Sequence, residues 1–221
     1  MGSDRSVGVV AGLAAEARIA RRLGWQVAIG GGTAAGAVTA ARRLAVAGAD
    51  ALISFGLAGG LDPALRPGAV IVPEAVIVSG VRHPTDPELS RMLGGATADT
   101  VLGAEAIAWS AEEKRCLHDR TSASAIDLES GAVACIAAAR GMPFAVLRAV
   151  CDPAERTLPA AALAAVDTHG TIGIWRIAAS LLARPGQLPA LLALAIDAAA
   201  ARRALIARVR GVTTRFVQNR T

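Results

Sequence analysis

Short apolar runs alternate along the front half of the chain with longer runs whose apolar residues recur every three or four positions. An apolar run of about four to eight residues bounded by glycine, proline or polar residues is typical of a buried strand, and the longer period is typical of a helix. The predicted strands are Val7–Ala11, Gln26–Ile29, Ala51–Phe55, Ala69–Val72, Ala75–Val78 (after Pro73), Ala125–Asp127 and Phe144–Ala149. The predicted helices are Ala14–Leu23, Ala34–Ala47 (with Thr33 as N-cap) and Ser130–Arg140. This alternation predicts an α/β protein with a largely parallel sheet that helices cover on both faces.

The tail of the chain has a purely helical pattern. We expect helices over Leu158–His169, Gly173–Ala183 and Leu188–Val209, with a turn at Pro185-Gly186 before the last one. The chain has no internal repeat, linker or low-complexity segment. We therefore predict one domain over residues 1–221, with a helical C-terminal part from about residue 158.

The composition indicates a folded protein with a basic surface. Hydrophobic residues make up 53% of the 221 residues, which excludes a disordered chain. The formal net charge is +5, and because Lys114 is the only lysine, almost all of the positive charge is arginine. A basic chain can bind nucleic acid, but these arginines are scattered, and the chain has no tyrosine to stack on bases. We expect no nucleic-acid partner.

The cysteines and the apolar runs indicate the compartment. Cys116, Cys135 and Cys151 are odd in number and lack C-x-x-C spacing, which argues against a disulfide framework or a zinc site and fits a reducing compartment. The apolar run from Val7 is interrupted at Glu16, so we interpret it as a strand and not as a signal peptide. We expect a cytoplasmic protein, with location at the membrane periphery as the alternative.

Acidic residues lie at or just after the ends of three predicted strands. They are Glu16, the pair Asp127 and Glu129, and Asp152. Strand ends are where α/β proteins build their sites, so three acidic positions there indicate an active site. Each also has a structural alternative, because a first-turn helix acid, a capping partner or a turn residue before Pro153 would look the same.

A glycine-rich segment, Gly30–Ala35, fits the dinucleotide-binding pattern G-x-G-x-x-A, with Asp50 about twenty residues further on. The context does not fit, because the acidic residue should end the second strand, whereas Asp50 precedes the strand that starts at Ala51. We instead expect a glycine loop at a helix N-terminus, which can hold an anion, with a tight turn that binds nothing as the equal alternative.

Three segments together resemble the purine nucleoside phosphorylase superfamily, and among its members the methylthioadenosine/S-adenosylhomocysteine nucleosidases. The segment Gly56–Leu61 with Arg66–Gly68 is similar to its glycine-rich strand end. Ile126–Ser130 resembles the V-E-M-E-[AS] signature, and Arg148–Asp152 resembles R-A-[IV]-S-D. The segments keep the family's order over roughly residues 7–180. The resemblance implies a three-layer α/β/α sandwich with a central mixed twisted sheet.

The resemblance also implies roles for single residues. Asp152 matches the acid that protonates the purine at N7, which requires a buried carboxyl group with a raised pKa. Glu129 matches the residue that binds the ribose hydroxyls, and Leu128 replaces the usual methionine under the sugar. Gly56 lies in the substrate-binding segment of the family, and Ile107 lies near the base pocket. Trp109 could replace the aromatic residue usual there, while Asp127 is one carbon shorter than its counterpart and is not expected to bind the sugar.

The nucleophile is less well defined by the resemblance. Glu16 matches the nucleosidase residue that positions and activates water. The arginine and serine with which phosphorylases bind phosphate are not preserved at the matching positions, Ser54 and Leu57. Arg18 together with Gly31, Gly32 and Thr33 could form another phosphate site.

Finer features, in residues 54–68 and 184–192, resemble the hopanoid-associated phosphorylases. This subgroup implies adenosylhopane as the substrate, phosphorolysis that releases adenine, and a homo-oligomer that binds a small, lipid-linked nucleoside. The alternatives are a hydrolytic nucleosidase of the methylthioadenosine type and a non-catalytic nucleoside-binding module. His83, His118 and His169 have no metal-ligand neighbours, so we expect neither a metal nor a cofactor, with phosphate as co-substrate of a phosphorylase.

Overall fold

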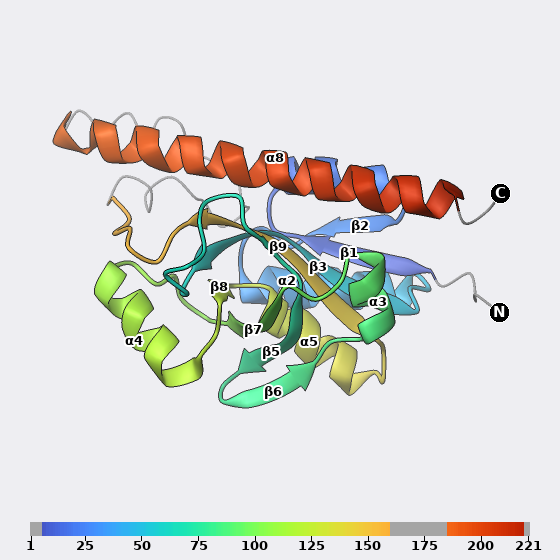
Figure 1. Ribbon diagram of the computed structural model, residues 1–221. Helices are drawn as coiled ribbons and strands as arrows, with labels where there is room; N and C mark the ends of the chain where they lie inside the picture. The colour runs from blue at the N-terminus through green and yellow to red at the C-terminus, as the bar shows by residue number, and fades with distance from the viewer. Residues whose placement is uncertain (1–5, 160–184, 219–221) are drawn as a thin grey trace.

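Figure 1 shows a computed structural model of the chain, in which residues 6–159 and 185–218 are described. The strands are β1 (Val7–Ala11), β2 (Gln26–Ile29), β3 (Ala51–Gly60), β4 (Val70–Ile71), β5 (Pro73–Val78), β6 (Val81–Pro84), β7 (Ala98–Gly103), β8 (Ala125–Asp127) and β9 (Phe144–Asp152). The α-helices are α1 (Ala14–Ala20), α2 (Ala34–Val46), α3 (Pro87–Met92), α4 (Ala111–Thr121), α5 (Ser130–Ala139) and α8 (Leu188–Gln218). Two short 3₁₀ turns are η1 (Arg21–Leu23) and η2 (Pro185–Gln187).

The described strands form one mixed sheet. Its main path has the order β2-β1-β3-β8-β7-β5-β6, and β9 pairs with β3 and β4. The pairs β1–β2, β1–β3, β3–β9, β5–β7 and β7–β8 are parallel, whereas β3–β8, β4–β9 and β5–β6 are antiparallel. The α/β class and the mixed sheet implied by the resemblance are confirmed.

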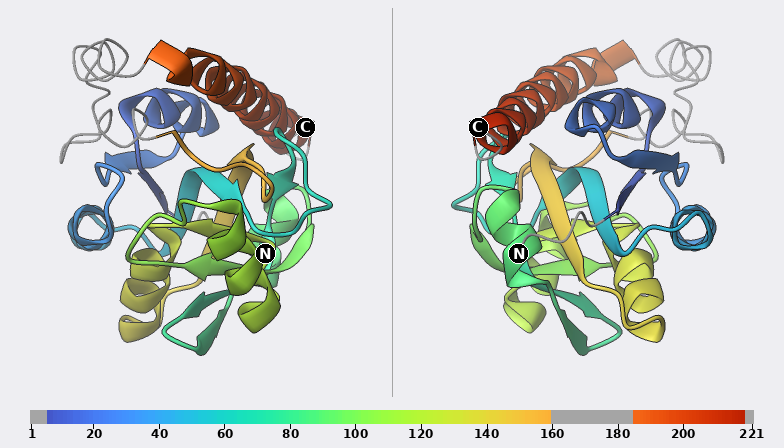
Figure 2. Two further views of the ribbon diagram at one scale, coloured as in Figure 1. Left: turned by 90° about the vertical axis from the view of Figure 1, so that its left-hand side faces the viewer. Right: turned by 90° about the vertical axis from the view of Figure 1, so that its right-hand side faces the viewer.

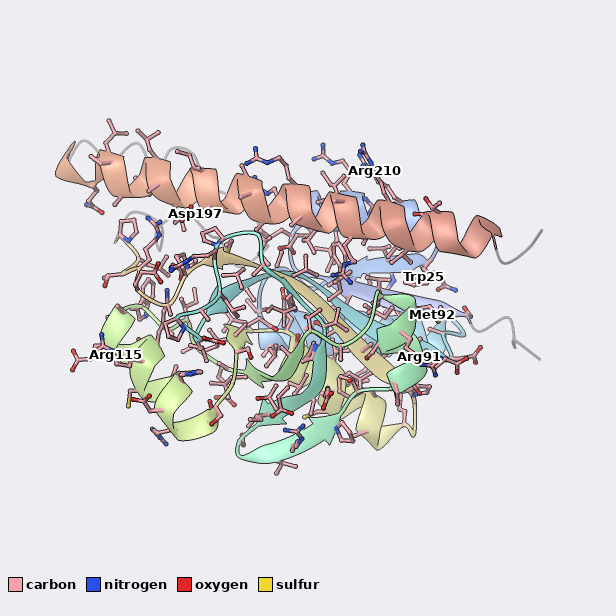
Figure 3. All side chains as sticks on the ribbon, in the orientation of Figure 1. Trp25, Arg91, Met92, Arg115, Asp197 and Arg210 are labelled. Carbon is pink, nitrogen blue, oxygen red and sulfur yellow. The ribbon has the colours of Figure 1, made fainter. Side chains whose placement is uncertain are left out.

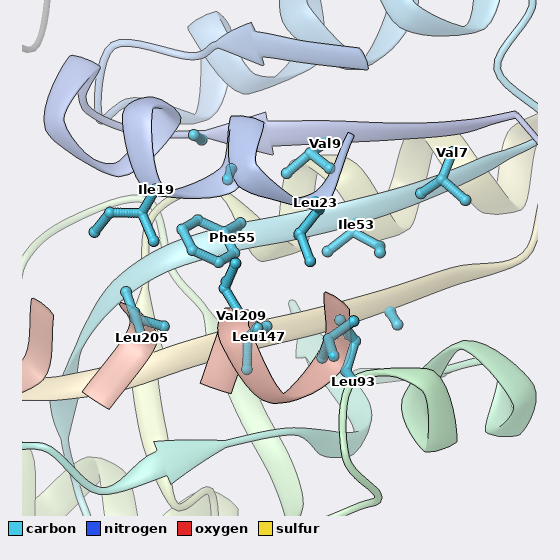
Figure 4. Close-up of a cluster of buried hydrophobic side chains, with 14 of the residues drawn as sticks. Val7, Val9, Ile19, Leu23, Ile53, Phe55, Leu93, Leu147, Leu205 and Val209 are labelled. Atoms are coloured by element: carbon cyan, nitrogen blue, oxygen red, sulfur yellow. The ribbon is translucent and has the colours of Figure 1, made fainter. Parts of the chain in front are cut away.

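Hydrophobic cores lie on both faces of the sheet because successive strand residues point to opposite sides. On β1, Val9 belongs to a core shared with α1 and α8, and Val10 belongs to a second core shared with α2 and α5. Figure 2 shows α8 and α1 lying together over one face of the sheet. In the first core, Phe55 of β3 lies beside Leu205 and Val209 of α8 (Figure 4).

Two central strands are longer than their apolar runs predict. β3 continues through Gly56 to Gly60, where β8 pairs across Gly59 and Gly60. A Cβ at Gly59 would lie 3.2 Å from the Ile126 side chain, so the glycines allow this close crossing. β9 continues past Ala149 to Asp152 because its pairing with β3 continues to that residue.

Other boundaries also differ from the prediction. The two strands predicted around Pro73 are present as β4 and β5, but the break between them falls at Val72, and Pro73 begins β5, where the missing N–H is tolerated. The helix predicted over Ala14–Leu23 ends at Ala20 and is followed by η1, and the last helix extends to Gln218. The pattern did not predict β6, α3 or β7.

The helices predicted over Leu158–His169 and Gly173–Ala183 lie outside the described residues, apart from Leu158 and Pro159, which are not helical. Within the part of the chain that the structure describes, no helix is both long and apolar enough to cross a membrane.

Candidate active site

A buried arginine, Arg148 on β9, joins polar residues from three strands and a helix. Its side chain is 1% exposed, and its Nη2 donates to Ser54 Oγ at 2.7 Å and to Asp127 Oδ1 at 3.1 Å. The same nitrogen lies 2.9 Å from Glu129 Oε2. Together with Ser130, which bonds to Ser54 and Asp127, these residues form what we call the Arg148 cluster.

Asp127 has an architectural position within the Arg148 cluster. Its Oδ1 accepts hydrogen bonds from the backbone N–H groups of Glu129 at 2.7 Å and Ser130 at 2.6 Å. Its Oδ2 accepts from Ser130 Oγ at 2.6 Å. Asp127 thereby satisfies donors at the start of α5 and neutralises Arg148. These bonds occupy both of its oxygens.

Glu129 lies at the junction of β8, α5 and the end of β1. A Cβ at Gly12 would come within 2.1 Å of Glu129 Oε1, so the carboxyl group lies directly over that glycine. Burial raises the pKa of Glu129 to about 7, against the opposing effect of the Arg148 guanidinium. Near neutral pH, Glu129 can therefore exist both as a carboxyl group and as a carboxylate.

Glu16 of α1 is brought to the same place. It is 3% exposed, and its carboxylate accepts from Leu13 N at 2.8 Å and from Leu57 N at 3.0 Å. Burial raises its pKa above the ordinary value, and Arg148 opposes this effect. A Cβ at Gly56 would lie 2.6 Å from Arg148 Nη1 and 2.8 Å from Glu16 Cδ. Gly56 therefore marks the point where Glu16 and Arg148 approach each other, and a larger residue there would displace one of the two side chains.

Asp152 ends β9, four residues beyond Arg148, or about 13 Å further along the strand. Its Oδ2 lies 2.5 Å from Nζ of Lys114, and both residues are buried. Its Oδ1 is buried and has no hydrogen-bond partner in the described part of the structure. Burial raises the pKa of Asp152, and the hydrogen bond and charge of Lys114 lower it again.

Lys114 of α4 was missed by sequence reasoning. Its burial is complete at 0% exposure, although it lies on a polar helix whose pattern gives no reason to bury a charge. The one sequence feature that distinguishes Lys114 is that it is the only lysine among many arginines.

Three further candidates for contacts with the base and sugar are not fully buried. Leu128 is half-buried between Asp127 and Glu129. Ile107 is 39% exposed in the segment before α4. The backbone of the half-buried Trp109 bonds to Glu113 Oε2 at 2.7 Å and to Leu158 N at 2.9 Å.

The candidate phosphate-binding groups are partly engaged in the fold. Thr33 is the N-cap of α2, as predicted, and its Oγ1 accepts from Gly36 N at 3.1 Å. The Gly31 N–H donates to Gly12 O at 2.9 Å, which places the glycine loop beside the end of β1. Gly31 and Gly32 have φ values of 75° and 71°, which glycine adopts without strain. Arg18 is exposed on α1.

The histidines do not join these groups. His83 lies on β6, and Nδ1 of His118 is 2.9 Å from Ala123 O, while His169 lies outside the described residues. Among residues 6–159 and 185–218, no group of three or more histidine, cysteine, aspartate or glutamate residues could hold a metal ion.

The chain is similar to known proteins in both sequence and fold. Residues 27–99 and 93–183 match the family described as the phosphorylase superfamily. No curated protein matches the sequence. Among solved structures, the chain is similar to a putative 5′-methylthioadenosine/S-adenosylhomocysteine nucleosidase from Francisella philomiragia, with 17% identity, a TM-score of 0.68, and coverage of 95% of this chain and 98% of that chain.

Two further structures show the same fold. One is the 5′-methylthioadenosine/S-adenosylhomocysteine nucleosidase from Neisseria meningitidis in complex with methylthio-immucillin-A, with 18% identity, a TM-score of 0.62, and coverage of 91% of this chain and 98% of that chain. The other is a futalosine hydrolase mutant from Helicobacter pylori, with 15% identity, a TM-score of 0.57, and coverage of 66% of this chain and 89% of that chain.

Proposed function

The chain belongs to the phosphorylase superfamily, and from this premise we propose that it cleaves the N-glycosidic bond of a 5′-modified adenosine and releases adenine. Membership of this superfamily confirms the expected enzyme class, a nucleoside phosphorylase or nucleosidase. The observation that carries the proposal is the set of buried carboxyl groups at the ends of β1, β8 and β9. All three of Glu16, Glu129 and Asp152 are buried, and burial raises the pKa of each.

The three carboxyl groups suit three different tasks. Asp152 donates a proton to N7 of the base as the electron pair of the C1′–N9 bond passes to the purine, so adenine leaves as a neutral molecule. Glu129 binds the ribose hydroxyls, and its negative charge stabilises the positive charge that develops on the sugar. Glu16 accepts a proton from the water that attacks C1′, and exchange with solvent returns a proton to Asp152.

The charge of the site favours water over phosphate as the acceptor. Around Arg148 lie the carboxyl groups of Asp127, Glu129 and Glu16, so negative groups outnumber this positive one. Such a site stabilises a cationic ribose but repels a phosphate dianion. Phosphorolysis remains the second candidate, because the glycine loop lies beside Gly12 at the N-terminus of α2, where an anion is favoured.

The outer face of α8 supports a lipid-linked substrate such as adenosylhopane. Leu188, Leu192 and Ile196 recur every four residues and are 48%, 55% and 64% exposed. On the opposite side of the helix, Asp197 faces the rest of the molecule (Figure 3) and lies 2.5 Å from Arg156, just beyond the end of β9. A row of exposed apolar side chains on this helix would suit a large apolar 5′ substituent and a location at the membrane periphery.

The reaction is tested by incubating the purified chain with methylthioadenosine and with adenosylhopane, each with and without inorganic phosphate. We expect adenine to be released without phosphate, together with the free sugar. Release that requires phosphate and yields a sugar 1-phosphate would establish phosphorolysis instead. If neither substrate releases adenine while both bind, the chain is a nucleoside-binding module.

The lipid-linked substrate is tested by the double variant L192Q/I196Q. Turnover of adenosylhopane should fall while turnover of methylthioadenosine stays unchanged. Val46→Gln is the matched control, because Val46 is 79% exposed on α2, away from α8. Unchanged turnover of the lipid substrate in the double variant would contradict this part of the proposal.

A further inference from the structure

The only lysine of the chain is completely buried against the proposed proton donor. Lys114 Nζ lies 2.5 Å from Asp152 Oδ2, 2.9 Å from Arg156 O and 3.1 Å from Pro153 O. An ammonium group has three donors and no acceptor, and these three oxygens match them one to one. The surroundings of Lys114 are therefore built for its charged form.

Among the residues that the structure describes, the other cation that acts on Asp152 is already paired. The charged groups with the largest effect on Asp152 there are Lys114 on α4, Arg156 on the segment after β9, and Asp197 on α8. Arg156 lies 2.5 Å from Asp197 and is paired with it. The direct hydrogen bond to the Asp152 carboxyl group comes from Lys114.

We propose that Lys114 is a positioning residue for Asp152: its ammonium group fixes the carboxyl group in place and stabilises the carboxylate that remains once the proton has left. This inference rests on the proposed function, in which Asp152 protonates the purine. Lys114 occupies Oδ2, whereas Oδ1 has no hydrogen-bond partner among the described residues, so the proposal assigns the proton transfer to Oδ1.

The proton balance explains why a cation is useful at this position. Before the reaction, Asp152 holds one proton and Lys114 is charged. When the C1′–N9 bond breaks, the proton passes to N7, and Asp152 becomes a carboxylate beside the ammonium group. Lys114 therefore acts mainly on the state after transfer, which makes Asp152 a stronger acid than burial alone would allow.

The first experiment compares the pH dependence of kcat/KM for adenine release in the wild type and in Lys114→Met. The wild-type rate should fall at high pH, where Asp152 loses its proton. Without the cation, this fall should move about one to three pH units higher. At neutral pH, kcat should decrease about 10- to 100-fold, less than for loss of the acid itself, while KM changes little.

Matched variants separate this role from a merely structural one. Arg66→Met removes one positive charge from an exposed pair with Glu155 and should leave the pH profile unchanged. Lys114→Gln keeps a hydrogen-bond donor without the charge and should show the same pH shift. It replaces Lys114→Met in the comparison if that variant folds poorly. A loss of stability with an unshifted high-pH limb in folded Lys114 variants would overturn the proposal.

The second experiment needs no enzymatic activity. Lysine labelled with ¹³C at Cε gives one NMR signal from this chain, because Lys114 is the only lysine. In the wild type, we expect the chemical shift of this signal to change as Asp152 ionises. In Asp152→Asn, this pH-dependent change should be absent. The same transition in both proteins would overturn the proposal. If the wild type released no base, the proposed function would fail, yet this titration would still show whether Lys114 controls Asp152.

Discussion

At the scale of the residue, Asp152 combines two properties that oppose each other. Burial favours its protonated form, while the ammonium group of Lys114 favours the carboxylate. A general acid needs both, because it must hold a proton at working pH and release it when the base departs.

The substitution Asp152→Asn tests the proposed acid. We expect kcat to fall about 10²–10⁴-fold, with substrate binding retained through Glu129. At a pH where Asp152 is a carboxylate, the substitution also leaves the buried charge of Lys114 unpaired, which commonly costs about 3–5 kcal/mol of stability. The double variant D152N/K114M removes both charges and should regain stability without regaining activity. Near wild-type turnover in either protein would refute the role of Asp152, and thermal unfolding verifies that both are folded.

The raised pKa of Glu129 predicts how the free energy of unfolding depends on pH. Its pKa is raised from 4.5 to about 7, so between these values the folded chain holds a proton that the unfolded chain releases. The stabilisation is complete below pH 4.5 and is lost as the pH rises through about 7, with a total of about 3 kcal/mol.

The measurement for Glu129 is urea unfolding between pH 5 and 8, in the wild type and in Glu129→Gln. The wild type should lose more unfolding free energy over this range than the variant. Some dependence remains in the variant, because burial raises the pKa of Glu16 and of Asp152 in the same direction. Equal slopes in the two proteins would contradict a raised pKa at Glu129.

At the scale of the element, α8 has different surroundings on its two halves. In the C-terminal half, Leu205 and Val209 are 0% exposed and belong to the core around Phe55. In the N-terminal half, Leu192 and Ile196 are exposed. The same helix thus contributes core residues in its C-terminal half and exposed apolar residues in its N-terminal half.

We expect Leu205→Ala to lower the unfolding free energy by about 2–5 kcal/mol, because it removes methyl groups from a closed core. Ile196→Ala on the same helix is the matched control and should change the unfolding free energy by about 0.5 kcal/mol or less. Chemical denaturation of the two variants measures the difference. Equal losses would mean that α8 does not form core at Leu205.

The hydrophobic pattern predicted elements well where strands are apolar and bounded by glycine or polar residues. β1, β2 and β8 have the expected bounds. β6 and β7 were missed because neither is a continuous apolar run. The start of α3 does carry a local signal, because Asp86 caps the helix and Pro87 is its first residue.

Pairwise features of the site could not be predicted from local pattern. The contact between Lys114 and Asp152 joins residues 38 positions apart, and the bond from Arg148 to Ser54 joins residues 94 apart. By contrast, the positions of Glu16, Glu129 and Asp152 near strand ends did indicate that they are site residues. The sequence contains no local rule for which buried cation faces which acid, because the sheet brings them together.

At the scale of the whole molecule, assembly stays a prediction. The resemblance implies a homo-oligomer, and exposed apolar side chains such as Ile29 and Val81 lie on the two edge strands of the main sheet path, β2 and β6. Light scattering at working concentration should give a mass of at least twice 22.3 kDa. A fully active monomer would contradict this expectation.

Because the only lysine is completely buried, cleavage after lysine can also measure how often the region around α4 unfolds locally. A protease that cleaves after lysine has one target bond, and that bond lies on α4, whose lysine side chain is enclosed in the folded state. Digestion should therefore be slow in the native protein and should yield only two fragments, residues 1–114 and 115–221. Where reclosing is faster than cleavage, the digestion rate follows the population in which this region is open. A ligand that binds beside Asp152 would then slow the cut, so binding could be measured on a gel without any label.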